Sequence, residues 1–399
     1  MTPDPHPPEP TGFFQPKPQK PTIFKEKRQS LGRRLLRELV RVGRQFRFVA
    51  VAPSYRLQKW QHDRHWDERV TFTNGSRPLT SKAFVIVLFQ PQGVSATTIE
   101  TCTTLAVNGY AVVAISNCPL SATDRRQLAT VCWKYGSRPN YGYDAGAYRD
   151  AVRVLETVGG VFEEVLMMND SIMFPLGGDI KVLEDLRRQP DGFGGLVLKT
   201  KARGAKAKRP LWDDFVEAYF FRCRGPLLQP NGLFWRVWRS LWLTPGRVDL
   251  KEGLVSYIFA FRGYPLVTVA SRATFIGRIK QASCPFLHKT LRYGAYADEH
   301  LAKQGAQLIE DWNGEEDDVW KTRTISHIEE VVYMQQFHYS FLYASYCFFG
   351  LSYFKKSKGN TQSATVKAYL AAVDAGDLPP PTPLQRRELE NPGNRQAWG

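Results

Sequence analysis

The chain has 399 residues, which is enough for one large or two modest domains with a substantial buried core. Its hydrophobic fraction of 43% and aromatic fraction of 13% are typical of a globular protein and exclude disorder throughout. The net charge of +16 is unevenly distributed, because residues 17–64 hold fourteen Lys or Arg against three acids, a net +11. This distribution argues against a nucleic-acid groove that runs over the whole fold.

The six cysteines form no Cys-x-x-Cys pair, and the first residues show no signal-peptide pattern. We therefore expect buried free thiols in a cytoplasmic protein. No metal site is expected from these cysteines.

The N-terminal part of the chain is predicted to contain a tail and a basic helix. Residues 1–28 are rich in proline and lack apolar periodicity, so we expect a disordered tail. Over residues 29–47 the apolar side chains fall on one side of a helical wheel and the arginines on the other. This amphipathic helix is predicted to bind an anionic membrane surface; packing on its own domain and binding of nucleic acid or another partner are alternatives. With the turn-rich linker that follows, the segment extends over residues 29–80.

Two nearly continuous apolar runs, at residues 83–89 and 110–116, are typical of strands that are covered on both faces in a parallel sheet. A helix is predicted between them at residues 97–107. Ser121 and Asp124 have the spacing of a capping box and begin another helix. This alternation predicts an α/β sheet in a domain over residues 81–275. Further elements of the domain are predicted as a helix at 180–188, a strand at 194–198, a helix at 250–261 and a strand at 266–270.

Residues 138–175 form a loop, a helix and a strand, with polar groups at each junction. Asp144 is predicted to be the N-cap of the helix, which would create an anion-facing helix start. The apolar run 165–168 is predicted to be a buried strand that ends in Asn169-Asp170-Ser171. Because open α/β sheets bind ligands at the carboxyl ends of their strands, the aspartate here is a candidate residue of a metal or phosphate site.

The loop N-x-G-Y-D-x-G at residues 140–146, followed by a hydrophobic strand that ends in N-D-S at residues 169–171, resembles the signature of the rhamnan synthesis F family. The similarity runs from about Lys82 to about Tyr293. It implies an α/β fold with a GT-A-like (Rossmann-like) nucleotide-sugar-binding sheet, flanked here by N- and C-terminal helical segments that we expect to associate with a membrane. It also implies an inverting glycosyltransferase of bacterial cell-surface polysaccharide assembly, with a deoxysugar donor such as dTDP-rhamnose.

The resemblance further implies a set of site residues. Asp170 would act in catalysis by holding a divalent ion, Mg²⁺ or Mn²⁺, although a strand-end acid that caps the next turn is the alternative. Because one carboxylate holds such an ion loosely, Arg138 or the basic segment 199–209 could take its place. Asp144 would bind a ribose or sugar hydroxyl, or merely cap its helix. The donor pocket would be formed by Arg138, Asn140, Gly142, Tyr143, Asp144, Gly146, Asn169 and Ser171.

A second catalytic candidate is Glu252, which is followed by glycine and leucine. The family carries a similar E-G-L or E-x-G-L segment where inverting enzymes of the GT-A type place the base that accepts the proton of the acceptor hydroxyl. The alternative is a first-turn acid that the helix dipole favours.

The C-terminal part is predicted to be a helical region over residues 276–375 and a loose tail over 376–399. Residues 337–354 are rich in Phe and Tyr, and the lysines that follow extend this segment to 358. We favour an interfacial or partner-binding helix for it, on a membrane or on another copy of the chain; a buried core helix is the alternative.

The expected partners are a nucleotide-sugar donor, a glycan or lipid-linked acceptor, and the cytoplasmic face of the cell membrane. Two other functional classes stay open at this point. One is a non-catalytic scaffold that keeps the fold, and the other is a nucleic-acid-binding protein, for which the sequence has no supporting motif.

Overall fold

The computed structural model describes residues 54, 56–159, 162–200, 214–241, 248–356 and 360–391. The chain divides into two units, Met1–Arg56 and Leu57–Gly399, and everything below concerns the second. The predicted tail 1–28 and basic helix 29–47 lie outside the described residues, as does the basic segment from 201 to 209.

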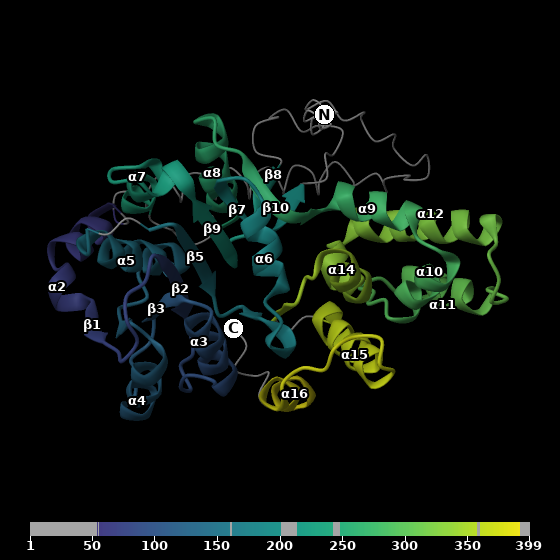
Figure 1. The fold of residues 1–399 in the computed structure, drawn as a ribbon, viewed down its shortest axis with the longest axis horizontal. Helices are drawn as coiled ribbons and strands as arrows, with labels where there is room; N and C mark the ends of the chain where they lie inside the picture. Colours follow the sequence, from purple (N-terminus) through teal and green to yellow (C-terminus); the bar gives the residue numbers. More distant parts are fainter. Residues whose placement is uncertain are drawn as a thin grey trace, which may run out of the picture. The chain divides into compact units, whose positions relative to one another are not determined.

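Within the described residues, a nine-stranded sheet has the order β1-β4-β3-β2-β5-β9-β7-β10, with β8 paired to β7 (Figure 1). Strands β4, β3, β2 and β5 are parallel, β1 is antiparallel to β4, and β9 is antiparallel to both β5 and β7. The strands are β1 Thr71–Asn74, β2 Lys82–Leu88, β3 Tyr110–Ser116, β4 Lys134–Ser137, β5 Glu164–Asn169, β7 Gly192–Thr200, β8 Asp214–Val216, β9 Phe220–Arg224 and β10 Leu266–Ser271. The predicted α/β fold class is confirmed, and β1 adds part of the predicted linker to the sheet.

The order of the strands reverses beside β2. From β2 the chain proceeds outward to β3 and β4, and then returns to place β5 on the other side of β2. The carboxyl ends of β2 and β5 therefore form a topological switch point, where the two neighbouring connections leave in opposite directions and open a crevice.

Helices cover both faces of the sheet, which explains why the central strands are apolar at nearly every position. Alternate side chains of β2, such as Val85 and Ile86, enter two different cores. One face is covered by α5 Tyr143–Thr157, α7 Leu233–Ser240 and α8 Val248–Phe261, and the other by α3 Ala96–Val107, α4 Ala122–Val131, α6 Lys181–Arg188 and α9 Arg272–Gln281. The predicted capping box of Ser121 and Asp124 at the start of α4 is confirmed.

The remaining helices form the C-terminal part of this unit, with α9 to α12 to the right of the sheet in Figure 1. They are α10 Cys284–Arg292, α11 Glu299–Glu310, α12 Asp318–Met334, α13 Phe337–Ser340, α14 Leu342–Phe349, α15 Asn360–Asp374 and α16 Pro383–Glu390; the short helix α2 Trp66–Arg69 lies near the start of the unit. Among the described helices, none combines the length and the apolar character that a membrane span requires. All six cysteines are free, and five of them are buried while Cys347 is exposed.

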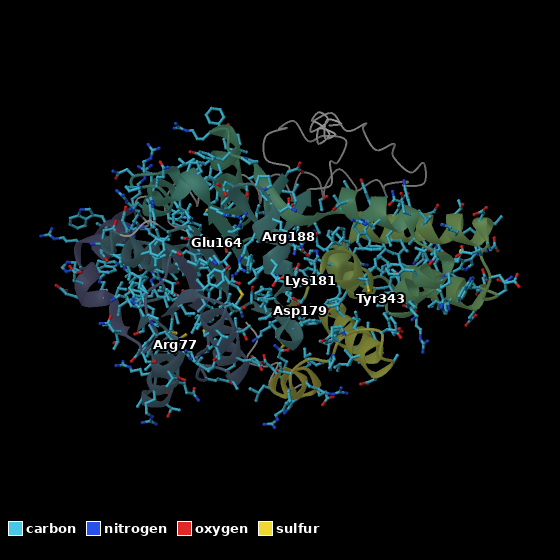
Figure 2. All side chains as sticks on the ribbon, viewed as in Figure 1. Arg77, Glu164, Asp179, Lys181, Arg188 and Tyr343 are labelled. Carbon is cyan, nitrogen blue, oxygen red and sulfur yellow. The ribbon has the colours of Figure 1, made fainter. Side chains whose placement is uncertain are left out.

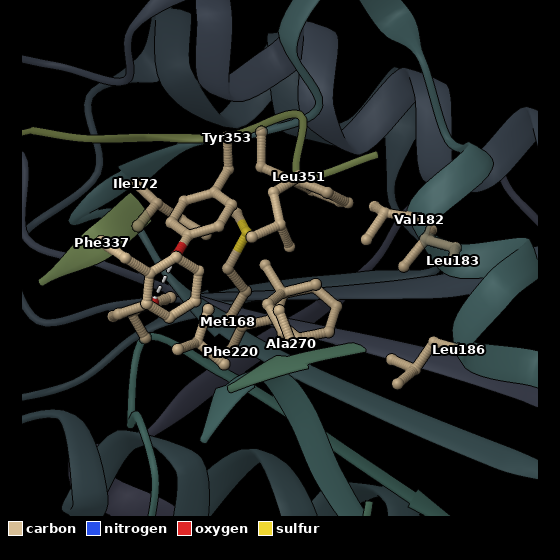
Figure 3. Close-up of a cluster of buried hydrophobic side chains, with 14 of the residues drawn as sticks. Met168, Ile172, Val182, Leu183, Leu186, Phe220, Ala270, Phe337, Leu351 and Tyr353 are labelled. Atoms are coloured by element: carbon tan, nitrogen blue, oxygen red, sulfur yellow. Dashed lines mark hydrogen bonds between the residues drawn. The ribbon is translucent and has the colours of Figure 1, made fainter. Parts of the chain in front are cut away.

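The aromatic segment 337–354 is part of the core, so our preference for an interfacial helix is wrong. It divides into α13, α14 and the strand β11 Phe354–Lys355, which pairs with β6 Ile172–Met173. Phe337 and Tyr353 pack against Met168 and Phe220 of the sheet in Figure 3, and Tyr343 lies among the C-terminal helices in Figure 2. In the sequence, a high density of aromatic residues is compatible with a core and with an interface. The pairing of β11 with β6 places the segment in the core.

Within the described residues, the segment expected to be a loose tail contains the helix α16, which is held by several side chains. Leu389 is fully buried, and the side chain of Gln385 donates to the carbonyl oxygen of Pro175 at 2.8 Å. The hydroxyl of Thr382 donates to Glu100 at 2.8 Å. These contacts join the C-terminal helix to the segment after β6 and to α3.

Replacing Leu351 by alanine tests whether the aromatic segment 337–354 belongs to the core. Its side chain is 2% exposed, so we expect the free energy of unfolding to fall by about 2–5 kcal/mol in chemical denaturation. The same change at Leu57, which is 52% exposed, should alter it by no more than about 0.5 kcal/mol. Equal effects at the two positions would contradict the core assignment of the aromatic segment.

Candidate functional site

A cavity of about 950 Å³ lies at the switch point of the sheet. Its volume is within the range of sites that enclose small-molecule ligands. The cavity is lined by Phe89, Gln90, Gln92, Gly93, Val94, Ser95, Ala96, Thr97, Asn117, Ser121, Thr123, Asp124, Gln127, Asn140, Tyr143, Asp144, Asn169, Asp170, Ser171, Lys356, Leu384, Arg387 and Glu388.

Three helices begin at this cavity. The N-terminal turns of α3, α4 and α5 supply Thr97, Thr123 and Asp144 to its lining. The N-terminus of a helix carries partial positive charge and unpaired backbone N–H groups, so their convergence favours an anionic ligand such as a phosphate.

Asp170 follows β5 directly and is fixed to the end of β2. Its backbone N–H donates to the carbonyl oxygen of Val87 at 3.0 Å, and its Oδ2 accepts from the backbone N–H of Phe89 at 2.7 Å. Burial raises the pKa of Asp170 to about 6, and the nearby Asp144 carboxylate adds to this rise against the opposing Phe89 hydrogen bond and Lys356 charge. A carboxyl group with a raised pKa in a cleft is a common mark of a functional site.

Asp144 lies beside the strand end rather than at the helix cap that we predicted. The N-cap of α5 is Gly142 at φ 73°, Tyr143 follows at φ 51°, and Asp144 is in the first turn. Its Oδ2 accepts from Nδ2 of Asn169 at 2.8 Å. Burial raises the pKa of Asp144, while this hydrogen bond and the charge of Arg138 act against the rise. Two partly buried carboxylates thus share one cavity.

The loop supplies Asn140 and Tyr143 to the cavity, and its glycines support the backbone. Tyr143 is 40% exposed, so its ring is accessible to a ligand. A Cβ atom at Gly146 would lie 2.3 Å from the carbonyl oxygen of Tyr141, so the close approach requires glycine. Neither Gly142 nor Gly146 lines the cavity.

Arg138 lies beneath the loop and does not line the cavity, so the structure gives no support to the predicted direct contact with a donor. Its guanidinium is 2.6 Å from Oδ2 of Asp150, and it donates to Asn117 at 2.7 Å and to the carbonyl oxygen of Tyr141 at 2.6 Å. The same Asp150 oxygen is 2.9 Å from Nε2 of His62. Arg138 therefore positions the loop from below.

The other predicted residues have different outcomes. Asn169 and Ser171 both line the cavity, and the Ser171 hydroxyl donates to Asn169. Glu252 lies in α8, but its side chain is outside the described part of the structure, and its role stays a prediction.

Sequence reasoning missed the wall formed by Lys356 and α16. Lys356 is positioned by the pairing of β6 with β11, which joins residues about 180 positions apart and leaves no local pattern. The lysines at 355, 356 and 358 are the visible signal in the sequence, but the pattern there favours an interfacial or partner-binding helix and not a cavity wall.

The described residues contain no group of three His, Cys, Asp or Glu side chains that could hold a metal ion. Mg²⁺ is often held by one or two carboxylates together with substrate phosphates rather than by a protein cage. Asp144 and Asp170 fit that arrangement, because both carboxylates line a cavity where helix N-termini favour phosphate.

Three comparisons with known proteins found similar chains, and the family match among them includes the signature. The uncharacterized protein y4gN of Sinorhizobium fredii is 26% identical over 211 residues, which is 52% of this chain and 52% of that relative, so the match spans about half its length. A solved structure of mannosyltransferase PcManGT from Pyrobaculum calidifontis, in complex with GDP-Man and Mn²⁺, covers 88% of this chain and 92% of its own at 15% identity and a TM-score of 0.31, which is too low to support an argument. Residues 112–264, from β3 to the end of α8 and with the whole signature, match the family of rhamnan synthesis protein F.

Proposed function

We propose that this protein is a glycosyltransferase of the GT-A type that transfers a sugar from a nucleotide-sugar donor to a glycan or lipid-linked acceptor. The supporting observation is the cavity at the switch point, where three helix N-termini and the carboxylates Asp144 and Asp170 surround space for a nucleotide diphosphate. The match to rhamnan synthesis protein F over residues 112–264 includes the part of the cavity lining from Asn117 to Ser171.

The proposed reaction breaks the bond between the anomeric carbon and the diphosphate and forms a bond to an acceptor oxygen. The helix starts of α3 and α4 would stabilise the charge that develops on the diphosphate. Asp144 and Asp170 would hold Mg²⁺ or Mn²⁺, which when bound supplies further neutralisation of that charge. The ring of Tyr143 would stack on the base or sugar. Glu252 would take the proton of the acceptor hydroxyl.

Further parts of the proposal rest on the resemblance and the sequence. They are a rhamnose donor, inversion at the anomeric carbon, and a role in cell-surface polysaccharide assembly. The basic segment 29–47 would place the enzyme at the inner face of the cell membrane, where anionic lipids attract arginine.

A donor screen tests the proposed activity. We expect one nucleotide-sugar, from a panel that includes dTDP-rhamnose, UDP-sugars and GDP-sugars, to raise the melting temperature by several degrees with Mn²⁺, because ligand binding stabilises the folded state. The same donor should be turned over with release of the nucleoside diphosphate. If no donor in the panel binds or reacts, the enzyme proposal is wrong and a non-catalytic scaffold is favoured.

A further inference from the structure

One wall of the cavity comes from a part of the chain far from the signature. Lys356 follows β11, and Leu384, Arg387 and Glu388 belong to α16. The family match ends at residue 264, so all four residues lie outside it. This wall brings two basic side chains to a cavity whose signature residues supply carboxylates.

Lys356 is fixed next to the strand end that carries Asp170. Its backbone N–H donates to the carbonyl oxygen of Ser171 at 2.7 Å, which continues the pairing of β11 with β6. Its charge acts to lower the pKa of Asp170, so the ammonium and that carboxyl group interact across the cavity. The main chain thus directs this lysine to the place where the metal or phosphate site was expected.

The ammonium of Lys356 is buried and held by two groups. The side chain is 7% exposed, and Nζ lies 3.0 Å from Oε1 of Glu388 and 3.5 Å from the hydroxyl of Thr97. Thr97, in the first turn of α3, also donates to Glu388. A buried lysine needs such a partner to stay charged. It has three N–H donors, so the two described neighbours leave one for a ligand in the cavity.

We propose that Lys356 binds the diphosphate of the donor and that Glu388 weakens this binding by competing for the same ammonium. The proposal rests on the proposed function and adds a charge that the signature does not contain. Lys356 lies between the start of α3 and Asp170, so a phosphate at this helix start would meet the ammonium. Arg387, exposed one position before Glu388 in α16, adds a second positive charge at the cavity edge.

A purely structural role would be to attach α16 to the domain. Other contacts already do this away from the cavity, through Gln385 to Pro175 after β6 and through Thr382 to Glu100. Neither of these residues lines the cavity. The two roles make different predictions for the two members of the ion pair.

Binding of dTDP, UDP and GDP to the full chain, measured by calorimetry with EDTA and with Mn²⁺, separates the roles. We expect Lys356→Met to weaken binding about tenfold or more, because a charged hydrogen bond to phosphate is lost. Glu388→Gln keeps the shape of the side chain and removes its charge, so binding should become tighter. The matched control is Lys289→Met, which removes the 2.5 Å ion pair of Lys289 with Asp377 away from the cavity and should leave the affinity unchanged.

The outcomes are distinguishable from failure of the proposed function. If the unmodified chain binds none of the three nucleotides and none of the sugar donors, the function itself is wrong, and this inference falls with it. If the unmodified chain binds but Lys356→Met binds equally well, or if both ion-pair variants weaken binding alike, the role of Lys356 is overturned. If Lys356→Met does not fold, Glu388→Gln decides, since a lack of tighter binding contradicts the competition.

Discussion

Asp170→Asn is expected to reduce turnover of the donor about 100-fold or more and to leave the protein folded. The carboxylate stands at the carboxyl end of β5, within the cavity and beside Asp144. Asparagine can still accept the hydrogen bond from the backbone of Phe89, so the strand end should keep its geometry. The loss would then come from the missing charge and not from a changed loop.

The pH dependence provides the check. The pKa of Asp170 in the folded protein is about 6, above its ordinary value near 3.9, so the folded state binds the proton more tightly than the unfolded chain. Its contribution to stability is therefore present below about pH 4 and is lost as the pH rises through 6. Asp170→Asn should be at least as stable as the unmodified chain at pH 8. Binding of Mn²⁺ with the donor should weaken below pH 6 by up to about tenfold per pH unit, and Asp170→Asn should make this dependence less steep while Asp144 remains to be protonated.

Asp191→Asn is the control for this series. This aspartate is paired with Arg224 at 3.3 Å and is half exposed, outside the cavity. Its replacement should change neither the turnover of the donor nor the pH dependence of Mn²⁺ binding. Full activity of Asp170→Asn would remove the metal hypothesis, and a large loss of stability in that variant would favour the strand-end cap instead.

Arg138→Met should produce the largest loss of stability, about 3–5 kcal/mol of unfolding free energy in chemical denaturation. Its partner Asp150 is 1% exposed, and removal of the guanidinium leaves that charge without its main counter-ion. Burial tends to raise the pKa of Asp150, but the hydrogen bond from His62 and the charge of Arg138 hold it below its ordinary value. In the variant, the buried Asp150 carboxylate lacks this counter-ion, and its burial destabilises the folded state.

The same substitution should also weaken donor binding, because Arg138 holds the carbonyl oxygen of Tyr141 in the loop before α5. Arg386→Met is the matched control, since Arg386 forms surface ion pairs with Asp374 and Glu390 and such pairs contribute little. A small effect at Arg138, comparable with the control, would show that the buried network does not support the loop.

Local patterns in the sequence predicted much of the sheet. The runs that became β2, β3 and β5 are apolar because both faces are covered. Their predicted bounds agree with the observed ones for β3 and differ by one residue at each end for β2 and β5. Because ligands bind at the carboxyl ends of strands, the sequence also predicted that the loop before α5 and Asp170 lie at the same site. In the structure, both line one cavity.

The errors share a physical cause. The type of a residue does not show which group it contacts. An arginine at position 138 was compatible with a phosphate contact and with the buried ion pair that the structure has. Asp144 follows the usual preference for an N-cap, but the left-handed Gly142 takes that position and frees the carboxylate for Asn169. The position of Lys356 depends on a two-residue strand pairing, and that of α16 on side-chain contacts with Pro175 and Glu100; periodicity gives no signal for either.

The position of α16 has a consequence for translation. A gene with a premature stop codon near position 380 would still encode every residue of the signature and every strand of the large sheet. Its product would nevertheless lack Leu384, Arg387 and Glu388, and with them one side of the cavity. A nascent chain on the ribosome lacks the same side of the cavity until α16 has emerged, so the cavity is complete only after residue 388 has left the ribosome.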